Sequence, residues 1–115
     1  MSIAIIDYGS GNLRSAEKAF ARCAPGRDLQ VTGDPDVVAR ADHIVLPGVG
    51  AFCACAQGLA AIDGLRAALE ARVVNDARPF LGICVGMQLM CTTGTERGQH
   101  EGRGWFEGSV DALDV

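Results

Sequence analysis

Short apolar runs alternate along this chain with longer segments that have the spacing of amphipathic helices. The runs predicted as strands span residues 2–7, 29–32, 43–47 and 79–84. The helical segments span residues 12–24, 34–36 (a short helix or turn), 62–73 and 85–91, and another begins at Phe52. Strands and helices that alternate in this way form βαβ units, with a parallel sheet covered by helices. We therefore predict an α/β fold with a mostly parallel sheet flanked by helices.

The last third of the chain has a weaker pattern. Residues 92–104 are polar and rich in glycine, which predicts a mobile loop. Residues 105–113 are predicted as a final strand. A chain of 115 residues has room for one domain.

Composition and charge exclude several classes of protein. Hydrophobic residues make up 49% of the chain, which is typical of a folded globular protein and argues against disorder. The net charge is −4 and the ten basic residues are scattered, so we expect no nucleic-acid partner. The apolar runs are far shorter than the ~18 residues of a membrane span, and the N-terminus lacks the basic start of a signal peptide. The odd number of cysteines, five, then indicates reduced thiols and a cytoplasmic location.

The sharpest motif is Gly82-Ile83-Cys84-Val85-Gly86, which lies between a predicted strand and a predicted helix. This is the pattern of a nucleophile elbow with cysteine at its centre. Small residues two positions on either side avoid clashes in such a turn, and the thiol stands at a helix N-terminus, which favours the thiolate. We predict that Cys84 is a nucleophile and that the Val85 N–H is left free to stabilise an oxyanion.

The alternative is that Cys84 is simply a buried apolar residue, as many cysteines are. For the remaining cysteines this structural interpretation is preferred, and Cys23 and Cys91 are expected to be small core residues of helices. Cys53 and Cys55 are one residue apart, which does not suit the usual spacing of zinc ligands. No metal site is expected.

Two further glycine-rich loops follow predicted strands. In Pro47-Gly48-Val49-Gly50-Ala51-Phe52, Gly50 is predicted to supply a second oxyanion donor opposite Val85, although a plain strand-to-helix turn has the same composition. In Asp7-Tyr8-Gly9-Ser10-Gly11-Asn12-Leu13, Gly9 and Gly11 lack the third glycine of a dinucleotide-binding loop, because position 14 is arginine. Asn12 is expected to cap the following helix.

Together these three segments resemble the class I (triad-type) glutamine amidotransferases, whose fold is flavodoxin-like. Residues 82–88 (GICVGMQ) are similar to the nucleophile motif of that family. Residues 7–15 (DYGSGNLRS) and 46–52 (LPGVGAF) resemble one branch, the glutaminase subunits of imidazole glycerol phosphate synthase.

The resemblance implies an activity and a partner. Such a subunit hydrolyses glutamine to glutamate and ammonia, and a separate (β/α)₈-barrel cyclase subunit uses the ammonia in histidine biosynthesis. No metal or organic cofactor is implied. By the same resemblance Cys84 is the nucleophile, Gly50 and Val85 are the oxyanion donors, Gln88 and Gly48 bind glutamine, and Asn12 faces the cyclase.

One departure from the family pattern limits this expectation. Family members complete their triad with a histidine and a glutamate far downstream, whereas the two histidines here are His43 and His100. His43 is predicted at the opposite edge of the sheet, about 13 Å from the loop by strand rise, and His100 lies in the polar loop. We therefore expect residues 1–115 to be the N-terminal part of a single domain, truncated and inactive alone.

Two other functions remain open on the sequence. The chain could belong to another class I amidotransferase or to a hydrolase with a cysteine elbow. It could also be a non-catalytic fragment that docks on a partner without turning over glutamine.

Overall fold

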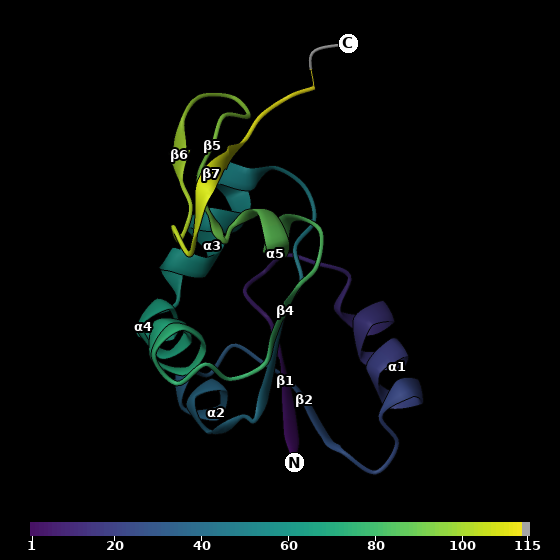
Figure 1. Cartoon of the computed structure of the whole chain (residues 1–115). Coiled ribbons are helices and arrows are strands. Elements are labelled where there is room, and N and C mark those ends of the chain that lie inside the picture. Colours follow the sequence, from purple (N-terminus) through teal and green to yellow (C-terminus); the bar gives the residue numbers. More distant parts are fainter. Residues whose placement is uncertain (114–115) are drawn as a thin grey trace.

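The computed structural model describes residues 1–113, which form a four-stranded sheet with helices on both faces and a smaller sheet beyond it (Figure 1). The elements of the first half are β1 (Ser2–Ile6), α1 (Leu13–Cys23), β2 (Asp28–Thr32), α2 (Pro35–Arg40) and β3 (His43–Leu46). They are followed by α3 (Phe52–Ala61), α4 (Leu65–Leu69), the π-helix η1 (Glu70–Asn75), β4 (Phe80–Gly82) and α5 (Val85–Gln88). The last elements are β5 (Cys91–Gly94), β6 (His100–Glu101) and β7 (Phe106–Val110).

The main sheet has the order β2-β1-β3-β4, and every neighbouring pair is parallel. Ile5 pairs with Val31 on one side and with Val45 on the other, and Leu46 pairs with Gly82. Because the strands are parallel, the loops after β1, β3 and β4 all leave from the same edge. The predicted α/β fold with a mostly parallel sheet is therefore confirmed, and the three glycine-rich loops meet at one edge.

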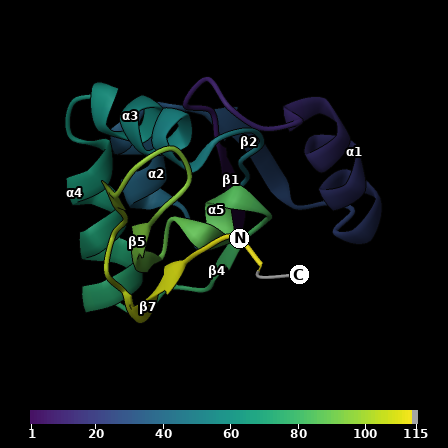
Figure 2. The same cartoon turned by 90° about the horizontal axis from the view of Figure 1, so that it is seen from above.

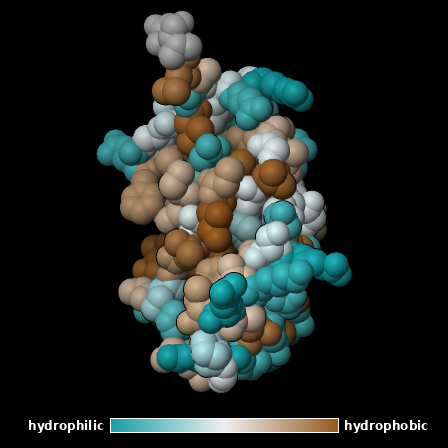
Figure 3. Space-filling view, turned by 90° about the vertical axis from the view of Figure 1, so that its right-hand side faces the viewer, coloured by the Kyte–Doolittle hydropathy of each residue, from teal (hydrophilic) through white to brown (hydrophobic). Residues whose placement is uncertain are grey.

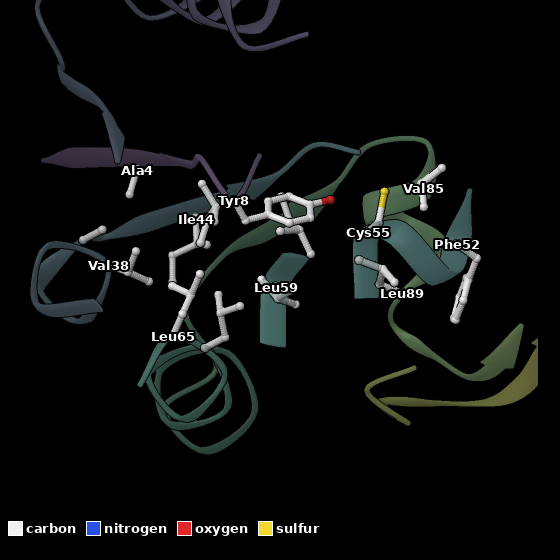
Figure 4. Close-up of a cluster of buried hydrophobic side chains, with 14 residues drawn as sticks. Ala4, Tyr8, Val38, Ile44, Phe52, Cys55, Leu59, Leu65, Val85 and Leu89 are labelled. Carbon is white, nitrogen blue, oxygen red and sulfur yellow. The ribbon is translucent and has the colours of Figure 1, made fainter. Parts of the chain in front are cut away.

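Alternating side chains of the strands fill two separate cores, as expected when both faces of a sheet are covered. Ile3, Ile5 and Val45 pack beneath α1, together with its residues Leu13 and Phe20. On the other face the core lies under α2, α3 and α4, which Figures 1 and 2 show on the side of the sheet opposite α1. This larger core contains Ala4, Ile6, Tyr8, Val38, Ile44, Leu46, Phe52, Cys55, Leu59, Leu65, Leu69, Val85 and Leu89 (Figure 4).

Two helices begin where the sequence predicts. The Asn12 side chain accepts a hydrogen bond from the Ser15 N–H at 3.4 Å, which satisfies a donor in the first turn of α1. Asp34 caps α2 in the same way through the Asp36 N–H at 2.9 Å, and Pro35 occupies the first turn. Cys23 was expected in the core but is exposed at the end of α1, because the apolar stripe of this helix ends at Phe20 and Ala24.

The chain after Cys84 differs from the sequence prediction in two respects. The helix expected over residues 85–91 is short, since α5 ends at Gln88 and Cys91 already belongs to β5. The mobile loop expected over residues 92–104 contains two strands: β5 pairs antiparallel with β6 and parallel with β7. The polar composition did not indicate these strands, because much of the small sheet is exposed and β5 pairs with β7 about 15 residues away in the sequence.

Contacts with β4, η1 and α3 hold the small sheet in place. The Phe80 and Trp105 rings meet edge to face with their centroids 5.2 Å apart. The Arg103 guanidinium lies 2.7 Å from the Glu70 carboxylate on η1. Gly94 is buried against the Phe52 ring so closely that a Cβ there would lie 2.6 Å from it. These contacts make the small sheet a packed part of the fold.

Part of the main sheet is open on the α1 side. Figure 3, which views the molecule from that side, shows hydrophobic side chains exposed across the middle of the face. The large exposed hydrophobic residues of β4, the elbow and α5 are Leu81, Ile83 and Met87. Within residues 1–113, β4 has β3 as its only strand partner, so its other edge is unpaired.

Over the described residues, no single helix combines the length and hydropathy needed to cross a membrane. Helix α3 and the segment Leu65–Asn75 meet that test only when taken together, and they are bent by 96° at the break between them.

Candidate active site

Cys84 lies at an abrupt strand-to-helix turn. β4 ends at Gly82 and α5 begins at Val85, so Cys84 is the residue before the first turn of the helix. Its backbone has φ 58° and ψ −120°, a conformation that side-chain-bearing residues rarely adopt. The thiol is exposed. The predicted elbow geometry is therefore confirmed, including the strained backbone at its centre.

The two glycines that flank the elbow are required by close backbone contacts. A Cβ on Gly82 would lie 2.7 Å from the Met87 Cα, on the first turn of α5. A Cβ on Gly86 would overlap the carbonyl group of Leu46 in β3. Neither obstacle is a flexible side chain, so any larger residue would push α5 away from the sheet and move Cys84 with it.

Backbone hydrogen bonds join the elbow to the last residue of β3 and to the loop that follows it. The Ile83 N–H donates to the Leu46 carbonyl oxygen at 2.9 Å, and the Val85 N–H donates to the Gly48 carbonyl oxygen at 3.3 Å. The two loops are therefore neighbours, as expected. The expectation that the Val85 N–H is free is wrong in this structure, because the Gly48 carbonyl occupies it. The role of Val85 as an oxyanion donor stays a prediction.

The loop after β3 changes from buried to exposed within two residues. Pro47 and Gly48 are buried against the elbow, whereas Val49 and Gly50 are exposed. Gly50 has φ +94°, in the region that favours glycine. This turn presents the backbone of Gly50 at the surface, on the same edge of the sheet as Cys84.

Three residues that the sequence analysis did not assign to the site hold this loop from the core side. The buried Tyr8 hydroxyl donates to the Pro47 carbonyl oxygen at 2.5 Å, and Figure 4 shows it directed toward the helix that carries Cys55. The Ser10 hydroxyl and the Cys55 thiol both lie within hydrogen-bond distance of the Val49 carbonyl oxygen. Burial, together with the neighbouring Cys55, raises the pKa of Tyr8 above its ordinary value. The glycine-rich motif that contains Tyr8 and Ser10 predicted a loop, but it did not indicate these contacts with residues far along the chain.

The remaining predicted site residues lie around the elbow and the loop after β1. Gln88 is the last residue of α5, half-buried, and it lines a hollow of about 280 Å³ together with Thr95, Glu96 and Asp111. Asn12 is exposed at the start of α1. The roles of Gln88, Gly48 and Asn12 in binding stay predictions.

The two histidines lie apart from the elbow turn in the fold. His43 begins β3, whereas Cys84 follows the opposite end of the neighbouring strand β4. His100 is on β6, and its Nε2 is 3.3 Å from the Arg97 carbonyl oxygen. In the part of the chain that the structure describes, no group of three His, Cys, Asp or Glu residues is arranged to hold a metal ion.

This α/β fold, with a cysteine elbow beside a glycine-rich loop, agrees with a comparison of the sequence with protein families. Residues 4–108 match the family described as glutamine amidotransferase class-I. The chain therefore belongs to the class I glutamine amidotransferase family.

Curated relatives carry a more particular name. The imidazole glycerol phosphate synthase subunit HisH of Rhodopseudomonas palustris is 56% identical over 114 residues, which cover 96% of this chain and 53% of the relative. Proteins of the same name from Rhodospirillum rubrum and Mesorhizobium japonicum are 53% and 54% identical over 117 residues. Those two matches cover 98% of this chain and 55% and 54% of the relatives. The chain spans about half the length of the curated relatives it matches.

Proposed function

We propose that this chain carries the nucleophile of a glutaminase subunit of imidazole glycerol phosphate synthase, in histidine biosynthesis. The observation that carries the proposal is the backbone of Cys84, which has φ 58° in a strand-to-helix turn. The next residue, Val85, is hydrogen-bonded to Gly48 in the loop after β3. The names of the relatives, at 53–56% identity, support this particular amidotransferase over others in the family.

The proposed chemistry is acyl transfer from glutamine through Cys84. The Cys84 thiolate attacks the carboxamide carbon, the C–N bond breaks, and ammonia leaves after gaining a proton. Water then hydrolyses the thioester to glutamate and restores the thiol. In this scheme Gly50 and Val85 supply N–H groups to the oxyanion, and Gly48 and Gln88 bind the glutamine. Val85 can do so only when its N–H leaves the Gly48 carbonyl.

The proton transfers need a base and an acid that residues 1–113 do not place beside Cys84. In the family a histidine and a glutamate do this work, and neither His43 nor His100 takes that position here. We propose that residues 1–115 correspond to the N-terminal part of a single amidotransferase domain. The coverage of the relatives, 53–55% of their length, supports this division.

The proposed partner is the (β/α)₈-barrel cyclase subunit, which would receive the ammonia in the cytoplasm. Asn12 is proposed to contact it, because the loop after β1 leaves the same sheet edge as the elbow and Asn12 is exposed there. No metal or organic cofactor enters the proposed reaction.

The test is a chimera in which residues 1–115 replace the corresponding residues of the Rhodopseudomonas palustris relative. We expect the chimera to release ammonia from glutamine when mixed with that organism's cyclase, and its Cys84→Ala variant to release none. Activity that survives Cys84→Ala would overturn the assignment of the nucleophile. A folded chimera that binds the cyclase without any turnover would favour a non-catalytic docking role.

A further inference from the structure

The Ser10 hydroxyl contacts both polar groups of one residue in the loop after β3. The Val49 N–H donates to the Ser10 oxygen at 3.1 Å, and the Ser10 O–H donates to the Val49 carbonyl oxygen at 2.9 Å. Ser10 itself is half-buried in the loop after β1. A single hydroxyl therefore joins the loops that follow two neighbouring strands of the sheet.

Two buried side chains reinforce this contact from the core. The Cys55 sulfur lies 3.1 Å from the Ser10 oxygen and 3.4 Å from the Val49 carbonyl oxygen. Tyr8 donates to the carbonyl oxygen of Pro47, two residues before Val49 in the same loop. In Figure 4 the Tyr8 hydroxyl and the Cys55 sulfur lie on the same side of the larger core, near Val85. Since Tyr8 and Cys55 are almost fully buried, the Val49 carbonyl is held toward the interior.

The direction of that carbonyl determines the direction of the next N–H. Residues 1–113 contain no cis peptide bond, so the Val49 C=O and the Gly50 N–H point in opposite directions across one planar unit. With the carbonyl turned toward Ser10 and Cys55, the Gly50 N–H is turned away from the core. We propose that Ser10 is a positioning residue that sets the orientation of the Gly50 N–H through the Val49 peptide.

This proposal rests on the proposed function, in which the Gly50 N–H stabilises an oxyanion. The position of the peptide can nevertheless be tested without glutamine. Amide hydrogen exchange of Val49 is measured by NMR on the whole 115-residue chain and on three variants. Ser10→Ala removes the hydroxyl, Ser10→Thr keeps it, and Ser15→Ala is a matched control at an exposed serine of α1. We expect Val49 exchange to be about fivefold faster in Ser10→Ala, the effect of one lost hydrogen bond, and unchanged in the other two.

A second measurement separates positioning from a merely structural role. With 4-nitrophenyl acetate, the Cys84 thiolate attacks the ester carbonyl through an oxyanion and expels 4-nitrophenolate, leaving an acetyl thioester. With iodoacetamide the same thiolate displaces iodide and no oxyanion forms. Peptide mass mapping distinguishes Cys84 from the other four cysteines, and Cys84→Ala sets the background. We expect Ser10→Ala to slow acylation about fivefold, to leave alkylation unchanged, and Ser10→Thr to restore acylation.

The outcomes distinguish the two proposals. Unchanged Val49 exchange in Ser10→Ala overturns the positioning role, and so does an equal loss of acylation and alkylation. If the wild-type chain acylates Cys84 no faster than the exposed Cys23, the oxyanion site and with it the proposed function are in error, whatever the exchange data show.

Discussion

The Gly48 carbonyl oxygen accepts a hydrogen bond from the Val85 N–H at 3.3 Å, which joins the loop after β3 to the first residue of α5. The same glycine has no space for a side chain, because a Cβ on it would lie 2.7 Å from the Gly86 nitrogen and from the Tyr8 hydroxyl. Two backbone segments, the loop after β3 and the start of α5, therefore meet at the sheet edge, with the Tyr8 hydroxyl packed against the same glycine. The geometry of Cys84 depends on this contact.

Gly86→Ala should be strongly destabilising. The new methyl group would overlap the Leu46 carbonyl, and a backbone obstacle cannot rotate away as a side chain can. We expect a loss of at least about 3 kcal/mol in the free energy of unfolding, measured by urea denaturation. Gly104→Ala is the control: φ is +68° there, but nothing lies within 4 Å, so only the backbone cost of about 1 kcal/mol applies. Equal losses in the two variants would show that α5 can move away from β3.

Phe52→Ala should destabilise the chain by about 3–5 kcal/mol, because the ring is fully buried and its removal leaves a cavity against Gly94. Phe106→Ala is the matched control, since that ring is 57% exposed and should cost about 0.5 kcal/mol or less. Thermal unfolding followed by circular dichroism compares the two variants. A small loss in Phe52→Ala would contradict the packing of the small sheet on α3.

Tyr8 should resist ionisation in the folded chain. Burial raises its pKa, so the neutral form is favoured in the native state while the unfolded chain ionises near pH 10. The stability that this group contributes is complete below pH 10 and is lost as the pH rises above it. Tyr8 is the only tyrosine in the sequence, so tyrosinate absorbance reports on it alone. We expect no tyrosinate signal at pH 10.5 until the chain unfolds, and half-ionisation near pH 10 in the folded chain would contradict the burial of the hydroxyl.

The 115-residue chain by itself should not turn over glutamine, with or without the cyclase. Neither histidine is placed to protonate the leaving ammonia or to activate water, and such proton transfers are worth on the order of 10²–10⁴-fold in rate. Iodoacetamide should still modify the exposed Cys84. Ammonia release that disappears in Cys84→Ala would show that a base has been overlooked, and His100 would be examined first.

Asn12 allows capping and partner binding to be separated. Asn12→Ala should lose about 1 kcal/mol of stability with the cap of α1, whereas Asn12→Ser keeps a capping oxygen and should be nearly neutral. If Asn12 contacts the cyclase, both variants should bind it more weakly, measured by titration calorimetry. Unchanged affinity in Asn12→Ser would leave Asn12 as a helix cap only.

Local features of the site could be predicted from the sequence because short-range sterics dictate them. The elbow at Gly82–Gly86 was recognisable because a strand, a turn and a helix follow one another there with small residues in fixed positions. The cap at Asn12 was predictable because it depends on neighbouring residues, and the parallel sheet was predictable because its strands and helices follow a repeated apolar pattern.

Only the tertiary structure decided which distant groups become partners. That Val85 donates to Gly48, that Ser10 holds Val49, and that residues 91–94 pair with β7 all depend on contacts between segments far apart in the chain. A backbone N–H or a serine hydroxyl bonds any acceptor that packing brings within reach, so residue type does not reveal the partner. The sequence by itself determined the α/β architecture and the position of the cysteine, and packing of the loops at one sheet edge determined how the backbone around that cysteine is held.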